Sequence, residues 1–378
     1  MHQKTLVFEE ALSLVAKIDP KYRPVWDGRS TEEQAALAMY FLPHSSGKPV
    51  LTPTRPQIIK WYCPFASQAE FPSGHRYCIN VYTGCAHQCV YCYAAGYEPE
   101  MPACKKRFGE LIQRDMLDLE RFGVPPAPVH LSNSTDPFQP LEAINGHTRY
   151  ALEQILAHRR RFTTVTILTK NPLFAVQHGY LELFEKLMPL PADHPSLGRL
   201  NQTGDPCFCL EVSIAFWQEE ARKIYDPGAP TIEERIAGIG AIRDAGIPAV
   251  LRIDPLFPRS PLREQPRKTL ADFGLQEAQT MDDLESLVAL AKEVGARHVV
   301  YSPAKIVQPR RRKLSEIMRA MRGAYECVAS PERLRFHGGS WRLPQDIARA
   351  GITEPFLNVC KRLGVTAKHC MRNLIETP

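Results

Sequence analysis

Six short apolar runs, rich in β-branched residues, alternate along the chain with longer segments whose apolar residues recur at helical spacing. The runs lie at 77–82, 128–132, 164–169, 208–215, 249–254 and 297–302. The longer segments lie at 108–121, 148–158, 173–187, 232–245 and 281–294. Alternation of buried strands with amphipathic helices predicts a parallel sheet joined by right-handed crossovers.

Six such units predict an α/β fold, a partial (β/α)6 barrel of TIM-like form with its chemistry at the carboxyl ends of the strands. The alternative is an open doubly wound sheet. No glycine-rich phosphate fingerprint such as GxGxxG or GxxxxGK[ST] occurs near the first strands. Its absence there disfavours nucleotide-binding versions of the open sheet.

Composition divides the chain into three parts, with the barrel over 76–309. Residues 1–75 form an extension rich in proline and polar residues, with a helix expected around Thr31 to Phe41 and capped by Ser30. Residues 310–378 form a basic extension of helices and loops that contains three cysteines.

The totals are those of a globular protein: 378 residues, 44% apolar and 23% charged. The first twenty residues carry charges and no apolar run long enough for a signal peptide or a membrane span, which predicts a cytoplasmic location and no membrane partner. In a reducing compartment, eleven cysteines favour metal ligation or redox chemistry. A net charge of +6 permits a polyanionic partner without requiring one.

The first barrel strand leads directly into a C-x3-C-x2-C loop formed by Cys85, Cys89 and Cys92. Three thiolates within eight residues can hold one face of a [4Fe–4S] cluster and leave the fourth iron without a protein ligand. That iron can chelate the amino and carboxylate groups of S-adenosylmethionine (SAM). A structural zinc site is the competing interpretation, but it needs four ligands and no second CxxC pair follows. His87 could be the fourth ligand, although its place between two of the cysteines favours an outward orientation.

This loop is the signature of the radical SAM superfamily, and the string NVYTGCAHQCVYCYA resembles the subgroup that contains spore photoproduct lyase and DNA-repair-photolyase-like proteins. The resemblance spans about residues 77–302. It is carried further by the segments 134–142, 148–156, 166–173, 211–216, 225–248 and 250–258.

The resemblance implies an enzyme that cleaves SAM reductively and uses the 5′-deoxyadenosyl radical to abstract hydrogen from a substrate. It also implies an external electron donor of the flavodoxin or ferredoxin type. The positions that it assigns to SAM are Tyr91, Ser134, Asp136, Lys170, Ser213 and Arg252. Tyr91 would pack on the adenine, Lys170 and Ser213 would bind the methionyl carboxylate, and Arg252 would contact the ribose or the substrate.

Two tyrosines, Tyr91 and Tyr93, flank the last cluster cysteine as in the lyases. They are candidate catalytic residues that could relay a radical, although packing against the cluster is the alternative. Where the lyases have a hydrogen-donating cysteine, this chain has Asn133. Asparagine has no weak S–H bond, which argues against the specific lesion-reversal chemistry.

The substrate class is expected to be a nucleic acid, on the resemblance and on the basic tail. That tail carries Arg310, Arg311, Arg312, Lys313, Arg319, Arg322, Arg333, Arg335, Trp341 and Arg342. A solvated helix face is the competing interpretation of the tail. A peptide or small-molecule substrate is the alternative within the enzyme class, and a non-catalytic iron–sulfur or nucleic-acid-binding module is the alternative outside it.

Eight further cysteines raise the question of an auxiliary iron–sulfur cluster. They are Cys63, Cys78, Cys104, Cys207, Cys209, Cys327, Cys360 and Cys370. Their spacings match no compact ligand motif, so the alternative is that they are apolar strand residues or incidental thiols.

Overall fold

The computed structural model describes residues 27–31, 33–34, 41–43, 51–53, 56–61, 76–99, 101–257, 277–309, 313–329, 334–337, 339–370 and 375–376. Its centre is a nine-stranded sheet in the order β16-β15-β11-β10-β9-β8-β7-β4-β3. The six predicted strands correspond to β4 (Tyr77–Ile79), β7 (Ala127–Leu131), β8 (Phe162–Thr169), β9 (Phe208–Ser213), β10 (Ala249–Leu256) and β11 (Val299–Pro303).

Each of these six strands pairs in parallel with the next one along the chain. A doubly wound sheet reverses its strand order at a switch point, and this sheet shows no reversal over β4 to β11. The partial-barrel prediction is therefore confirmed and the open alternative is excluded.

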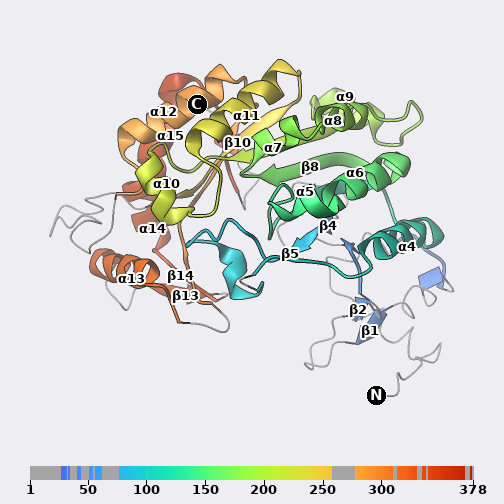
Figure 1. Cartoon of the computed structure of the whole chain (residues 1–378), viewed down its shortest axis with the longest axis horizontal. Helices are drawn as coiled ribbons and strands as arrows, with labels where there is room; N and C mark the ends of the chain where they lie inside the picture. Colours follow the sequence, from blue (N-terminus) through green and yellow to red (C-terminus); the bar gives the residue numbers. More distant parts are fainter. Residues whose placement is uncertain are drawn as a thin grey trace.

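The helices cover the outside of the sheet in the order of the strands that they follow (Figure 1). They include α4 (Phe108–Arg121), α6 (His147–Ala157), α7 (Pro172–Gln177), α11 (Ile232–Asp244), α12 (Met281–Glu293) and α15 (Glu354–Leu363). Neighbouring helices pack on one another, α4 on α6, α7 on α11 and α12 on α15. A continuous apolar core fills the space between strands and helices.

Two helix predictions need correction. The segment 173–187 is two helices, α7 and α8 (Leu181–Leu187), because Gly179 adopts a φ of 69° that ends the first helix. Ser30 caps a helical turn as predicted, accepting from the Glu33 amide at 3.2 Å, but Phe41 belongs to the strand β1 (Phe41–Pro43), so the helix does not extend to it.

Both extensions contribute strands to the sheet. From the N-terminal part, β3 (Ile59–Lys60) pairs antiparallel with β4. The tail was expected to contain helices and loops, yet β15 (Ala367–His369) pairs in parallel with β11 and β16 (Ile375–Glu376) follows it. An exposed backbone edge on β11 accepts a strand too short to show a hydrophobic period of its own.

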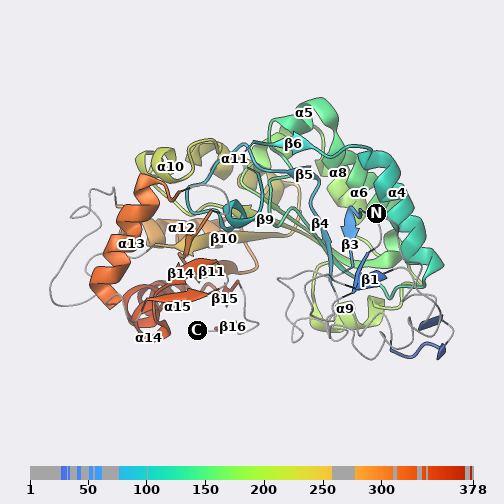
Figure 2. The same cartoon turned by 90° about the horizontal axis from the view of Figure 1, so that it is seen from below.

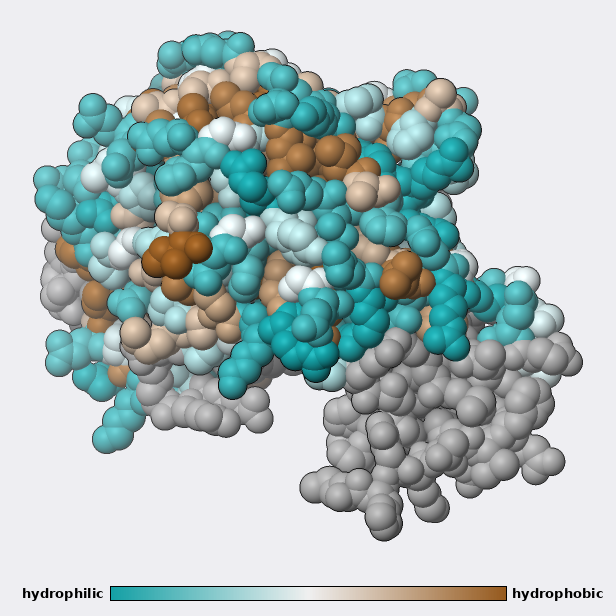
Figure 3. Space-filling model, turned by 45° about the vertical axis from the view of Figure 1, so that its right-hand side comes forward, coloured by the Kyte–Doolittle hydropathy of each residue, from teal (hydrophilic) through white to brown (hydrophobic). Residues whose placement is uncertain are grey.

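A small antiparallel sheet stands beside the barrel. It consists of β12 (Ile306–Val307), β14 (Ser340–Arg342) and β13 (Arg335–His337), with α13 (Glu316–Ala329) next to it. Figure 2 places this unit at the opposite end of the molecule from β1. None of the helices in the described part of the chain is both long and apolar enough for a bilayer crossing. The face in Figure 3 is mostly hydrophilic with scattered apolar patches, as expected when most large apolar side chains lie in the core.

Candidate active site

The cysteine loop follows β4 and a short strand, β5 (Tyr82–Thr83), and ends at the 3-10 turn η2 (Tyr93–Gly96). The turn into the loop requires Gly84, whose φ is 68° and whose missing Cβ would lie 2.5 Å from the Met101 carbonyl oxygen. Cys85, Cys89 and Cys92 are free thiols that all line one cavity of about 250 Å³. The sequence motif therefore lies on the wall of a hollow at the carboxyl ends of the strands.

The segment 225–228 is hydrogen-bonded to the cysteine loop. The Val90 amide donates to the Tyr225 carbonyl at 3.0 Å, and the Gly228 amide donates to the His87 carbonyl at 3.0 Å. His87 is buried and lines the cavity, so the outward orientation expected from its place between two cysteines is wrong. Its Nδ1 lies 3.1 Å from the Gly228 carbonyl and its Nε2 lies 3.1 Å from Asp136.

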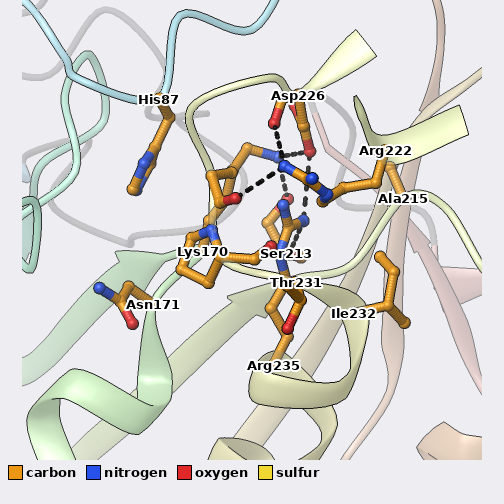
Figure 4. Close-up of polar contacts among 12 residues, drawn as sticks. His87, Lys170, Asn171, Ser213, Ala215, Arg222, Asp226, Thr231, Ile232 and Arg235 are labelled. Atoms are coloured by element: carbon orange, nitrogen blue, oxygen red, sulfur yellow. Dashed lines mark hydrogen bonds and ion pairs between the residues drawn. The ribbon is translucent and has the colours of Figure 1, made fainter. Parts of the chain in front are cut away.

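Lys170, which follows β8, reaches across the cavity floor. Its Nζ donates to the Tyr91 hydroxyl at 2.9 Å, to the Ser213 hydroxyl at 3.0 Å and to Asp226 at 3.2 Å. Figure 4 shows Lys170 and Arg235 pointing at Asp226 from two sides. Three residues that the sequence assigned to the SAM pocket, Tyr91, Lys170 and Ser213, therefore share one hydrogen-bonded group.

The centre of that group is Asp226, a fully buried carboxylate. Burial alone raises the pKa of Asp226, but the charges of Lys170 and Arg235 outweigh burial and hold this pKa below its ordinary value. The Arg235 guanidinium, from α11, lies 3.2 Å from the carboxylate and is itself fully buried. The carboxylate is therefore ionised at neutral pH.

Asp136 lies in the same cavity, but its oxygens are occupied by the protein. One oxygen accepts from the Thr169 hydroxyl at 2.8 Å and the Phe138 amide at 2.9 Å, and the other accepts from the Lys170 amide at 2.6 Å. Asp136 thus fixes the ends of β7 and β8 next to each other. Ser134 lines the cavity nearby, with its hydroxyl 2.7 Å from that of Tyr97.

The two candidate catalytic tyrosines point in different directions. The Tyr91 ring packs on Phe257 and its hydroxyl donates to Asp226 at 2.5 Å. The Tyr93 hydroxyl donates to the Asn133 carbonyl, and the Lys305 ammonium lies 5.3 Å from the Tyr93 ring centre. Burial raises the pKa of both phenols well above the ordinary value, so both are protonated at neutral pH.

Arg252 also lines the cavity, and its guanidinium forms ion pairs with two carboxylates. Its guanidinium contacts Glu211 at 2.6 Å and Asp254 at 2.7 Å, and it also donates to the Cys370 sulfur at 2.7 Å. Burial alone raises the pKa of Glu211, but the Arg252 charge lowers it below its ordinary value. Sequence reasoning found Arg252 but missed its partners.

The cysteines outside the loop do not support an auxiliary cluster. Cys209 and Cys360 are buried in apolar clusters, Cys78 is buried and its sulfur accepts from the Asn133 side-chain amide at 3.4 Å, and Cys370 lines the cavity. Cys63 lies outside the described residues, as does the side chain of Cys327. In the described part of the chain, no group of three or more His, Cys, Asp or Glu side chains forms a site for a single metal ion.

A cubane cluster makes a different demand from a single ion, because each cysteine binds its own iron atom. The donor set fits that demand. Cys85, Cys89 and Cys92 are three free thiols of one loop, they line the same cavity, and no disulfide competes for them. The cations Lys170, Arg252 and Lys305 line that cavity as well, and they complement the charge of a thiolate-ligated cluster.

Comparison with known proteins places the chain among uncharacterized relatives. It is 28% identical to an uncharacterized protein of Mycobacterium tuberculosis over 196 residues, 49% of this chain and 50% of that protein. It is 23% identical to one of Methanocaldococcus jannaschii over 185 residues, 49% of this chain and 62% of that protein. The chain thus matches only about half of the length of these curated relatives. No family model matches it.

Among solved structures, a cysteine-to-serine variant of spore photoproduct lyase superposes with a TM-score of 0.52 at 13% identity, covering 84% of this chain and 79% of that one. The chain has the fold of spore photoproduct lyase. Another spore photoproduct lyase structure, with a dinucleoside spore photoproduct, gives a TM-score of 0.50 at 13% identity over 78% of this chain and 75% of that one. The match to spore photoproduct lyase confirms the expected partial-barrel fold.

The structure also places residues in the site that sequence reasoning did not select. Asp226, Arg235 and Arg222 all lie in or next to the segment 225–248, for which the family resemblance implies no roles for single residues. The available signal was charge: Asp226 directly follows a helix, and the helix that follows carries Arg235 among apolar residues. A charged residue at an apolar helical position indicates a buried ion pair.

Proposed function

We propose that the chain is a radical SAM enzyme in which Cys85, Cys89 and Cys92 hold a [4Fe–4S] cluster. The observation that carries this proposal is that these three thiols line one cavity with Lys170 and Ser213. When bound, the cluster would supply the electron for reductive cleavage of SAM to methionine and a 5′-deoxyadenosyl radical, which would abstract hydrogen from a substrate. An electron donor of the flavodoxin or ferredoxin type belongs to the same proposal.

The side chains of the cavity have defined parts in this scheme. Lys170 and Ser213 offer an ammonium and a hydroxyl to the methionyl carboxylate. Tyr91 offers an apolar ring within the loop, for the adenine of SAM, and is held by its hydrogen bond to Asp226.

The direct test is SAM cleavage by anaerobically reconstituted protein. With dithionite and SAM, the wild-type chain should release 5′-deoxyadenosine, and the Cys85, Cys89 and Cys92 triple alanine variant should release none. Iron and sulfide are counted on the same samples, and a fall from about four irons to none is expected. An iron-loaded wild type that releases no 5′-deoxyadenosine would instead indicate a non-catalytic iron–sulfur module.

A nucleic-acid substrate is the finer part of the proposal. It is supported by the small sheet beside the cavity, where the Arg322 guanidinium lies 4.5 Å from the Trp341 ring centre and Phe336 is 56% exposed. Aromatic rings next to cations suit stacked bases and a phosphate backbone. Of the basic tail predicted from sequence, Arg310, Arg311, Arg312 and Arg333 lie outside the described residues, as does the side chain of Arg335.

Binding of a fluorescent single-stranded oligonucleotide tests the substrate class. The Trp341→Ala variant should weaken binding about fivefold to a hundredfold, the usual range for loss of one stacking platform. Arg243→Ala, which removes a surface arginine from α11, serves as the control. Equal binding by both variants and the wild type would favour a peptide or small-molecule substrate.

A further inference from the structure

The carboxylate of Asp226 connects the floor of the cavity to the cysteine loop. One of its oxygens accepts from Tyr91 at 2.5 Å, and the other faces Lys170 and Arg235, each at 3.2 Å. Tyr91 stands between two of the loop cysteines in the sequence. The position of this carboxylate therefore sets the positions of the ring and the ammonium that face the cavity.

Asp226 is held by its backbone and is not free to adjust. Arg222 donates to the carbonyls of Asp226 and Pro227 at 3.2 Å and to that of Ala229 at 2.9 Å, which clamps the segment from outside. From inside, Gly228 packs so closely that a Cβ there would lie 2.2 Å from the Ala86 carbonyl oxygen. The segment 225–229 and the cysteine loop are thus joined by backbone hydrogen bonds and close packing as well as by the contact between Tyr91 and Asp226.

Charge adds a second consequence. One carboxylate faces two cations, Lys170 and Arg235, so the buried group carries a net charge of about +1 next to the cysteine loop. Charges interact strongly where water is excluded, and the fully buried Asp226 and Arg235 are in such a place. Replacing Asp226 or Arg235 by a neutral residue changes the net charge of this group by one unit, and with it the electrostatic potential at the cysteines.

We propose that Asp226 and Arg235 are positioning residues of this cavity, which hold Lys170 and Tyr91 in place and set the reduction potential of a cluster bound to the loop. The inference rests on the proposed function for the presence of that cluster. Beyond that function, it assigns a role to the buried ion pair of Asp226 and Arg235, which acts through Lys170 and Tyr91. Reduction potentials of iron–sulfur clusters depend on such nearby charges.

The test measures the midpoint potential of the cluster by redox titration followed by electron paramagnetic resonance. Asp226→Asn removes a negative charge and should shift the potential to more positive values, because the reduced cluster carries more negative charge. Arg235→Gln removes a positive charge and should shift it to more negative values. The double variant restores the net charge and should lie near the wild type.

Potential shifts of opposite sign in the two single variants would identify an effect of charge. A shift caused by lost packing would not depend on the sign of the charge that was removed. Asp115→Asn is the matched control: Asp115 is also fully buried, but the partners of its carboxylate are the Ile58 amide at 2.5 Å, the Ile59 amide at 3.0 Å and Arg114 at 3.0 Å, none of which lines the cavity. It should lose stability without a shift in potential.

Unchanged potentials, or shifts of the same sign in both single variants, overturn the proposal. If Asp226→Asn takes up no iron, Asp226→Glu decides: iron uptake by this charge-conserving variant supports the proposal, and failure of both reduces Asp226 to a folding role. A wild type that binds no cluster defeats the proposed function instead, so the two failures are distinguishable.

Discussion

At the scale of single residues, Lys170 is the cation that joins the tyrosine of the cysteine loop to the next strand. Lys170→Met removes the ammonium that contacts Tyr91, Ser213 and Asp226. We expect SAM affinity to fall about tenfold to a hundredfold, the cost of a lost hydrogen bond to a charged group. Equilibrium dialysis of the iron-loaded protein with labelled SAM measures it.

A control for this variant is Lys186→Met. Lys186 is exposed and pairs with Glu182 one helical turn away at 2.6 Å, a contact of small energetic value. Its SAM affinity should equal that of the wild type. Equal affinity in both lysine variants would show that the ammonium of Lys170 does not bind the carboxylate of SAM.

His298 gives the cavity wall a pH dependence. Burial, with Lys368 nearby, lowers the pKa of His298 to about 4, whereas an unfolded histidine titrates near its ordinary 6.5. The neutral ring therefore stabilises the fold fully above about pH 6.5, and this contribution is lost as the pH falls towards 4. Denaturant unfolding from pH 7 to pH 4 should show a steeper loss of stability in the wild type than in His298→Asn. Parallel curves would contradict it.

At the scale of elements, α11 and α7 approach closely next to Lys170. A Cβ on Gly238 would lie 2.4 Å from the Leu173 amide nitrogen, at the start of the helix that follows Lys170. Gly238→Ala should force the helices apart, lower the stability by about 1–3 kcal/mol as overpacking does, and weaken SAM binding. Thermal unfolding and dialysis together measure both effects.

Gly240 lies two residues further along α11, and a Cβ at this position would meet no neighbour, unlike one at Gly238. Nothing lies within 4 Å of a Cβ built there, and Gly240 is inside α11. Gly240→Ala should raise the stability by about 0.5–1 kcal/mol through helix propensity. If both alanine variants were stabilised, close packing of α11 against α7 would not be what places Lys170.

The elements that could be predicted from sequence are those with a strong hydrophobic period. The strands β8 and β9 and the helix α4 fall where the apolar pattern places them, because a buried strand or an amphipathic helix needs several apolar residues in a row. The helix break at Gly179 and the three-residue strand β15 were missed, because each depends on one residue or on a distant partner.

The residues of the candidate site also differ in whether the sequence alone could identify them. Cys85, Cys89 and Cys92 could be found because their spacing is local. Asp226 was missed because its importance comes from Lys170 and Arg235, which lie on other elements and meet it only in the folded chain. The contact between Lys170 and Asp226 spans 56 residues and leaves no local pattern, whereas Arg235 at an apolar position of its helix was a local sign of a buried ion pair.

At the scale of the whole molecule, the tail completes the barrel. β15 covers the edge of β11 and brings Lys368, His369 and Cys370 to the cavity wall. A chain ended after residue 313 should expose the backbone edge of β11, aggregate on purification and lose its cooperative thermal transition. Size-exclusion chromatography and calorimetry against the full chain test this, and a monomeric, cooperative truncated chain would contradict it.

The pairing of β11 with β15 also has a consequence for biosynthesis. The ribosome makes the cysteine loop well before β15, the strand that closes the cavity wall beside β11. Until β15 is made, the three thiols would face an open half-barrel, so we expect stable iron loading only after β15 has left the ribosome. Nascent chains stalled before residue 340 should retain no iron, while chains that include β15 should retain it.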